Sequence, residues 1–190
     1  MISKQYLCFA ACLQIAAKET AGVVLDQIAI GNHLGVALPV GFDCSGLVEQ
    51  GLTNIRYEAD VALWGITPIV RDINMVLSLS VPRLECRFEA ISQFQDWEFE
   101  ERLATLAKSG HFPIVCFDYN SLIGETSEEN RGHCVVVYGV GSSAKRCGGA
   151  IDIYDPGPKD AGFRTVASDS LYLACRKRHG GVWSLVPVVG

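Results

Sequence analysis

The sequence has no apolar run as long as the roughly 18 residues that a membrane-spanning helix needs, so we expect no membrane insertion. It also lacks a basic stripe. The 190 residues carry a formal net charge of −5, which argues against nucleic acid as a partner. Internal repeats, low-complexity tracts and linkers are absent as well. Length and composition therefore predict a single globular domain over residues 1–190.

Metal-ligand spacing is also missing. None of the eight cysteines stands in a C-x-x-C pair, and the four histidines show no paired spacing, so the sequence predicts no metal site and no cofactor. The cysteines are scattered and several lie in apolar runs, which is typical of reduced, buried thiols. The apolar stretch at residues 6–11 is shorter than the core of a signal peptide. We therefore expect a cytoplasmic protein.

The hydrophobic period changes near Gly110. Before it, helical spacing and end signals predict helices at 8–21, 26–34, 67–77 and 96–108. After it, short β-branched or aromatic runs predict strands at 113–117, 134–140, 150–154 and 182–188, a hairpin loop at 141–149 and a last helix at 169–178. This order favours an α+β fold, with N-terminal helices packed on a C-terminal antiparallel sheet.

Three segments carry the parts of a thiol active site. A catalytic thiol needs a base that takes its proton and an environment, such as a helix N-terminus, that favours the thiolate. Cys8 begins the first predicted helix, His133 lies at the mouth of an apolar strand, and Asp155 ends the next strand. A hairpin brings such a strand start and strand exit to one end of a sheet, so His133 and Asp155 are expected to meet.

These segments resemble those of papain-like cysteine peptidases, and most of all the bacteriocin-processing peptidases that cut after double-glycine leaders. The run C-F-A-A-C-L from Cys8 is similar to that family's Cys-Gly-Ala-Ala-Cys-Leu start, and Gly132-His133 and Asp155-Pro156 are similar to its Gly-His and Asp-Pro pairs. The resemblance implies a papain-like fold and a peptide or protein substrate. It also implies that Cys8 is the nucleophile, His133 the general base and acid, and Asp155 the orienting carboxylate.

Two positions depart from that family's pattern. The oxyanion Gln, which normally stands six residues before the Cys, is represented here by Gln5, three residues before it. Phe9 replaces the Gly that follows the Cys, and we expect its ring to crowd the approach to the thiol.

Cys44 is the alternative nucleophile. Residues 42–48, F-D-C-S-G-L-V, resemble the Asp-Cys-Ser-Gly motif of NlpC-type cell-wall peptidases, in which the Cys also begins a helix. The helix after Cys44 is predicted to be poor, because Gly51 interrupts it soon. That family's third group is His, Asn or Gln, where this chain offers Asp155. We therefore rank Cys8 ahead of Cys44.

Several functions stay open on the sequence alone. The first is hydrolysis of a peptide, isopeptide or other amide bond through an acyl-thioester on Cys8. A papain-like acyltransferase would pass the same acyl group to an amine, an NlpC-type amidase would use Cys44, and an inactive binding module would use neither. Substrate sequence and oligomeric state are not determined by these patterns.

Simpler interpretations apply to most of these residues taken singly. Cys8 alone is typical of a small buried hydrophobe, and residues 155–157 alone are a turn signal, so only the ordered combination favours chemistry. Cys12, one turn behind Cys8, is expected in the core. We also expect core positions for three tryptophans and surface positions for three histidines: Trp64, Trp97 and Trp183, and His33, His111 and His179.

Overall fold

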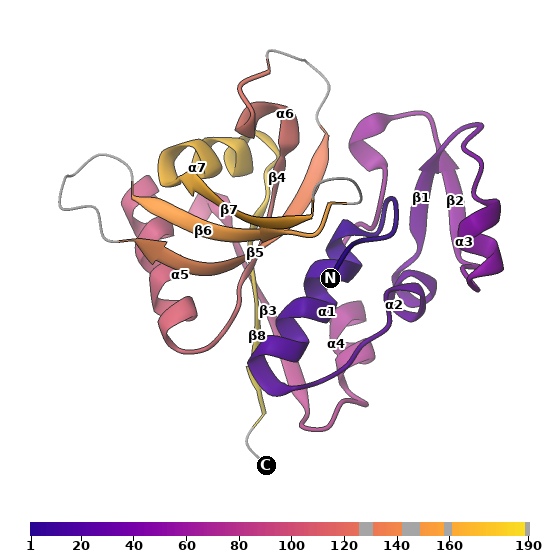
Figure 1. Ribbon diagram of the computed structural model, residues 1–190, viewed down its shortest axis with the longest axis horizontal. Coiled ribbons are helices and arrows are strands. Elements are labelled where there is room, and N and C mark those ends of the chain that lie inside the picture. The colour runs from indigo at the N-terminus through magenta and orange to yellow at the C-terminus, as the bar shows by residue number, and fades with distance from the viewer. Residues whose placement is uncertain (126–130, 142–148, 158–160, 189–190) are drawn as a thin grey trace.

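The computed structural model describes residues 1–125, 131–141, 149–157 and 161–188, and its architecture is α+β (Figure 1). An antiparallel six-stranded sheet has the strand order β3-β8-β4-β5-β6-β7. Its strands are β3 (Leu84–Ala90), β4 (Ile114–Asp118), β5 (Gly132–Gly141), β6 (Ala150–Asp155), β7 (Gly162–Ala167) and β8 (Gly181–Pro187). A parallel pair, β1 (Val36–Pro39) and β2 (Ile55–Glu58), lies apart from this sheet, on the far side of α1 (Figure 1).

Helices cover both faces of the six-stranded sheet. α1 (Cys8–Ala21) packs on one face, across β4, β5 and β8, while α5 (Asp96–Lys108) and α7 (Ser168–Lys177) pack on the other. The remaining helices are α2 (Gln27–Leu34), α3 (Ser45–Glu49), α4 (Val70–Leu77) and α6 (Tyr119–Leu122). Among the described residues, no helix has the length and apolar character needed to cross a bilayer.

The alternation of side chains along β5 divides the interior into two cores. Cys134 and Val136 belong to the core under α1, whereas Val135 and Val137 belong to the core under α5 and α7. A strand that is buried on both faces reads as a continuous apolar run, as residues 134–137 do. β5 is therefore held from both sides, and its first residues are fixed relative to α1.

The two longest helices have the end signals that the sequence predicts. α1 ends at Gly22, which has φ 70° and donates its N–H to Ala17 O and Lys18 O. α5 begins with a capping box between Gln95 and Glu98. The predicted helices at 26–34 and 169–178 are also present to within a residue at each end.

The predicted start of the helix at 67–77 is wrong. α4 begins at Val70, with Ile69 as its N-cap, and the Thr67-Pro68 signal lies outside it. The reason is the preceding Gly65, which exchanges two backbone hydrogen bonds with Ala37 of β1 and draws the chain into an extended path. The sequence prediction also missed β1, β2, β3, β7 and α6, whereas α3 is the poor helix expected after Cys44. The loop expected at 141–149 lies largely outside the described residues.

The aromatic predictions had mixed outcomes. Trp183 is buried, as expected, and Trp64 is partly buried, with its indole N–H donating to Glu58 O at 3.0 Å. Trp97 is 61% exposed, so its predicted core position is wrong. The buried face of α5 passes through Phe99, Leu103 and Leu106, which turns Trp97 away from the core.

Among the smaller predictions, Cys12 is buried, and His33 and His179 are exposed, all as expected. His111 is partly buried. The expectation that Phe9 crowds the thiol is wrong: its side chain is 1% exposed, and its ring packs edge-on against Trp183, with 5.5 Å between centroids. Phe9 points from α1 into the core.

Phe9→Ala should therefore destabilise the protein through the cavity that it leaves. We expect the free energy of unfolding to fall by about 3–5 kcal/mol in urea denaturation. The matched control is Phe163→Ala, since Phe163 is 68% exposed, and its loss should be about 1 kcal/mol or less. Equal losses in the two variants would contradict the core position of Phe9.

Candidate active site

Cys8 is the first residue of α1, and the chain enters it through an unusual backbone. Tyr6 has φ 62°, a left-handed conformation that is uncommon for a residue with a side chain. Its ring packs against Phe42 and Trp64, with centroids 5.0 and 6.1 Å away, which holds this conformation in place. The N-cap residue of α1, Leu7, offers no side-chain hydrogen bond, so the first-turn N–H groups face the site unpaired by a cap.

His133 stands at the beginning of β5 and is oriented by three neighbours. Its Nε2 lies 2.7 Å from Oδ1 of Asp155, the last residue of β6, which leaves Nδ1 for the Cys8 thiol. The rings of Phe117 and Tyr119 contact the imidazole edge-on, at 5.7 and 5.4 Å between centroids. The structure thus pairs His133 with Asp155 and places Cys8 near enough to influence the pKa of the imidazole, the juxtaposition that the sequence analysis expects.

The electrostatics favour a thiolate and an imidazolium. The pKa of Cys8 lies well below its ordinary value, because Cys134 hydrogen bonds to the sulfur, His133 adds a hydrogen bond and a positive charge, and the Phe9 N–H contributes; burial opposes these. Burial lowers the pKa of His133, but hydrogen bonds to Asp155 and Cys8 outweigh it and raise that pKa to about 10.

Asp155 stays ionised beside this pair. Burial raises the pKa of its carboxyl, but the hydrogen bond and charge of His133 and the N–H of Gly157 bring it below its ordinary value. The Gly157 N–H donates to Oδ1 at 2.8 Å, and a guanidinium nitrogen of Arg164 lies 4.0 Å from Oδ2. The carboxylate therefore has partners of its own besides the imidazole.

Hydrogen bonds on both sides hold the site's framework. Asp118, fully buried at the end of β4, accepts from the backbone N–H groups of Ser121 and Arg131 and pairs with Lys177 at 3.0 Å. Asp118 stands opposite Gly132 in the β4–β5 register, and Gly132 directly precedes His133. At the other side, the Ser3 N–H donates to Pro156 O at 2.6 Å, which ties the N-terminal segment to the end of β6.

The other candidates are not part of this cluster. Cys44 precedes α3, and its sulfur lies 3.2 Å from the hydroxyl of Tyr57, with no imidazole among its described contacts. Gln5 is exposed on the turn before Cys8, and within the described part of the chain no hydrogen bond orients its amide. Its oxyanion role stays a prediction.

Sequence reasoning missed two contributors to the site. Cys134 follows His133 directly, yet its contact with Cys8 depends on how α1 crosses β5, which no local pattern reveals. Asp118 had a readable signal: it follows an apolar strand run and precedes Ser121 by three residues, the spacing of a helix N-cap.

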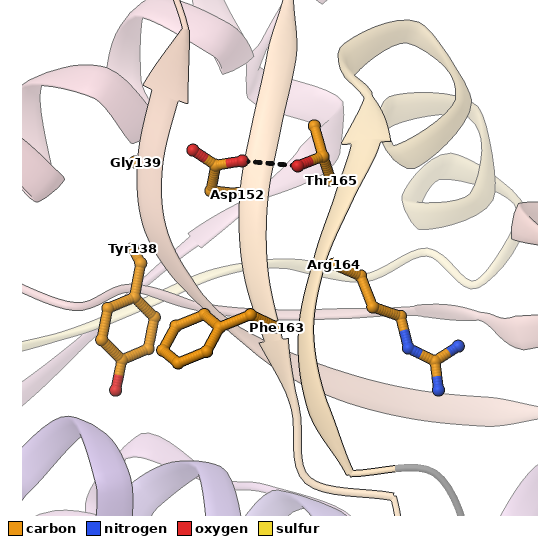
Figure 2. A pocket seen from close by; sticks show the side chains of 6 residues that line it. All are labelled: Tyr138, Gly139, Asp152, Phe163, Arg164 and Thr165. Atoms are coloured by element: carbon orange, nitrogen blue, oxygen red, sulfur yellow. Dashed lines mark hydrogen bonds between the residues drawn. The ribbon is translucent and has the colours of Figure 1, made fainter.

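A separate open pocket of about 400 Å³ lies along β5, β6 and β7 (Figure 2). Tyr138 and Phe163 lie side by side at one end of it, and Asp152 and Thr165 form a 2.7 Å hydrogen bond at the other. Of its lining residues, Arg164 also reaches Asp155, so the pocket adjoins the candidate site without containing its reacting groups.

Comparison with known proteins leaves the family open. No protein-family model matches the chain, and no curated protein matches it. Among the residues that the structure describes, no group of three or more His, Cys, Asp or Glu side chains is arranged to hold a metal ion.

The lowered pKa of Cys8 predicts selective alkylation in acid. At about pH 6 a free thiol is almost entirely protonated, whereas a thiol paired with an imidazolium at a helix start is largely thiolate. Brief labelling with iodoacetamide should therefore modify Cys8, as mapped by mass spectrometry, and His133→Ala should slow that labelling. Cys12, whose pKa is raised by burial, is the internal control. Preferential labelling of Cys44 would contradict this assignment.

Proposed function

We propose that the protein is a thiol-dependent hydrolase that cleaves a peptide or other amide bond through an acyl-thioester on Cys8. The observation that carries the proposal is the His133–Asp155 pair, with 2.7 Å between Nε2 and Oδ1, beside the Cys8 thiol at the start of α1. The lowered pKa of Cys8, to which His133 contributes, supports it. We also propose a papain-like fold, which the position of α1 across the antiparallel sheet supports. A cytoplasmic location is part of the proposal, supported by the free thiols of the described cysteines.

The proposed reaction follows from the charges of the site. The Cys8 thiolate attacks the substrate carbonyl, and the uncapped N–H groups at the start of α1 stabilise the oxyanion that forms. The imidazolium of His133 then gives its proton to the leaving amine, and the neutral ring takes a proton from the water that hydrolyses the thioester. Asp155 remains a carboxylate and holds the ring in one orientation throughout.

The family resemblance bears on the substrate class, and the acyl acceptor depends on which nucleophile can reach the thioester. Resemblance to the double-glycine leader peptidases favours a peptide with small residues before the cut. Acyl transfer to an amine uses the same thioester, so hydrolysis and transfer differ in which nucleophile reaches Cys8. A Cys44 mechanism receives less support, because the described contacts of Cys44 lead to Tyr57 and not to a base.

Asp155→Asn tests the orienting carboxylate. The amide retains the size of the side chain but loses the charge that favours the His133 imidazolium, so kcat should fall by about 10⁴-fold, as in the serine-protease counterpart of this change. The pKa of His133 should fall too, so the basic limb of the pH–activity profile should move to lower pH. Unchanged turnover with an unchanged pH–activity profile would show that Asp155 is a turn residue with no part in the reaction.

A reporter peptide with a fluorogenic amine after Gly-Gly tests the proposal as a whole. Cys8→Ala should abolish amine release, while Cys44→Ser, a matched thiol removal, should leave it intact. EDTA should have no effect. Added hydroxylamine should divert part of the acyl group if a thioester forms, and a preference for an added amine over water would identify a transferase. Release that survives Cys8→Ala would contradict the proposed nucleophile.

A further inference from the structure

A second pair of thiols lies directly behind Cys8. Cys116 of β4 and Cys134 of β5 face each other in the strand register, and their sulfurs are 2.9 Å apart. Residues directly opposed in an antiparallel pair have Cα atoms about 4.5–5.5 Å apart, inside the range of about 4.4–6.8 Å that disulfides span. The backbone at this position is thus already suited to a cross-strand disulfide.

Cys134 connects that pair to the candidate nucleophile. Cys8 packs against the same core cluster as Cys134 and Cys116. Cys134 contacts Cys116 and makes the largest contribution to the lowered pKa of Cys8. Cys8, Cys134 and Cys116 thus lie in one cluster under α1, and we name these three thiols the thiol relay.

The thiols of the relay differ in reactivity, because Cys8 favours the thiolate and Cys134 the protonated thiol. Cys8 is partly exposed, and its pKa is lowered, so a small oxidant meets a thiolate there first. Cys134 is buried, and its pKa is raised by the hydrogen bonds to Cys116 and Cys8, so it stays a protonated donor until Cys8 loses its charge. The buried thiols of Cys86 and Cys175, whose pKa values burial raises, have no such thiolate partner among their described contacts.

We propose that Cys134 and Cys116 are a resolving pair that rescues Cys8 after oxidation by a hydroperoxide and stores the oxidation as a Cys116–Cys134 disulfide. This rests on the thiolate state of Cys8 in the proposed function, but not on its substrate. The oxidant is hydrogen peroxide or an organic hydroperoxide.

The proposed oxidation and its resolution take three steps. The Cys8 thiolate attacks one peroxide oxygen, the O–O bond breaks, and the leaving oxygen takes the proton of His133 and departs as water, or as an alcohol from an organic hydroperoxide. The Cys134 sulfur displaces the hydroxyl of the Cys8 sulfenic acid, and its proton leaves with that oxygen as water. Cys116 then attacks Cys134, the Cys8–Cys134 bond breaks, and Cys8 departs as a thiolate while His133 accepts the Cys116 proton. One peroxide is reduced and two thiols are oxidised.

One equivalent of hydrogen peroxide added to the fully reduced chain at neutral pH tests the relay. After alkylation, mass spectrometry should find the Cys116–Cys134 disulfide, and Cys8 should still react with iodoacetamide. The disulfide should form roughly tenfold more slowly in Cys8→Ser, because the remaining thiols are mostly protonated. Cys44→Ser is the matched control and should give the wild-type pattern.

Two variants separate the steps. With one equivalent of peroxide, Cys116→Ser should stop at a Cys8–Cys134 disulfide. With two or more equivalents, Cys134→Ser should accumulate sulfinic acid on Cys8, because each of the two oxidation steps consumes one peroxide. The proposal is overturned if the unsubstituted chain gives sulfenic Cys8 with one equivalent of peroxide, or sulfinic Cys8 with two, and forms no disulfide. That result does not depend on any variant folding. It is also overturned if the disulfide forms equally fast without Cys8. Failure of the reporter peptide to be cleaved, with the disulfide pattern intact, would instead count against the hydrolase alone.

Discussion

The packing of α1 across the six-stranded sheet is the constraint on which the candidate site depends. Cys8 is the first residue of that helix, and its partners His133 and Cys134 are neighbours on β5, held between two cores. The apolar side chains of α1, Phe9 among them, fix where its N-terminus lies over the sheet. A small shift of the helix would move the Cys8 thiol away from both His133 and Cys134. The geometry of the site therefore depends on the packing of the core.

The site also has to hold charge in a largely buried place. A thiolate, an imidazolium and a carboxylate lie in series, and burying such groups is unfavourable unless each is paired and hydrogen bonded. The helix start and the Phe9 N–H face the sulfur, while the Gly157 N–H and Arg164 face the carboxylate of Asp155. The pKa of Cys8 falls despite burial, which otherwise raises the pKa of a thiol, because Cys134, then His133 and the Phe9 N–H favour the thiolate. In both proposals, this charge separation is what would make Cys8 reactive, toward carbonyl carbon in one and toward peroxide oxygen in the other.

The sequence revealed the parts of the site that stand at element ends. Cys8 at a helix start and His133 and Asp155 at strand ends are marked by local patterns, and the structure brings all three together. The missed parts depend on long-range pairing. Cys116 meets Cys134 through a register across β4 and β5, and β3 pairs with β8, almost at the other end of the chain. The L-E-C-R-F alternation of β3 was readable, but its partner was not. Thr67 carried a helix signal that the pairing of Gly65 with β1 overrode.

The protonation state of His133 shows whether Cys8 and His133 form a thiolate–imidazolium pair. Heteronuclear NMR of the two ring nitrogens at neutral pH reports whether both carry protons. We expect that they do, because Asp155 and the Cys8 thiolate raise the pKa of the imidazole far above its ordinary value of 6.5. Alkylation of Cys8, which removes the sulfur's charge, should lower that pKa. A ring that is neutral at pH 7 in the untreated protein, and that titrates at the same pH after alkylation, would contradict the thiolate–imidazolium pair.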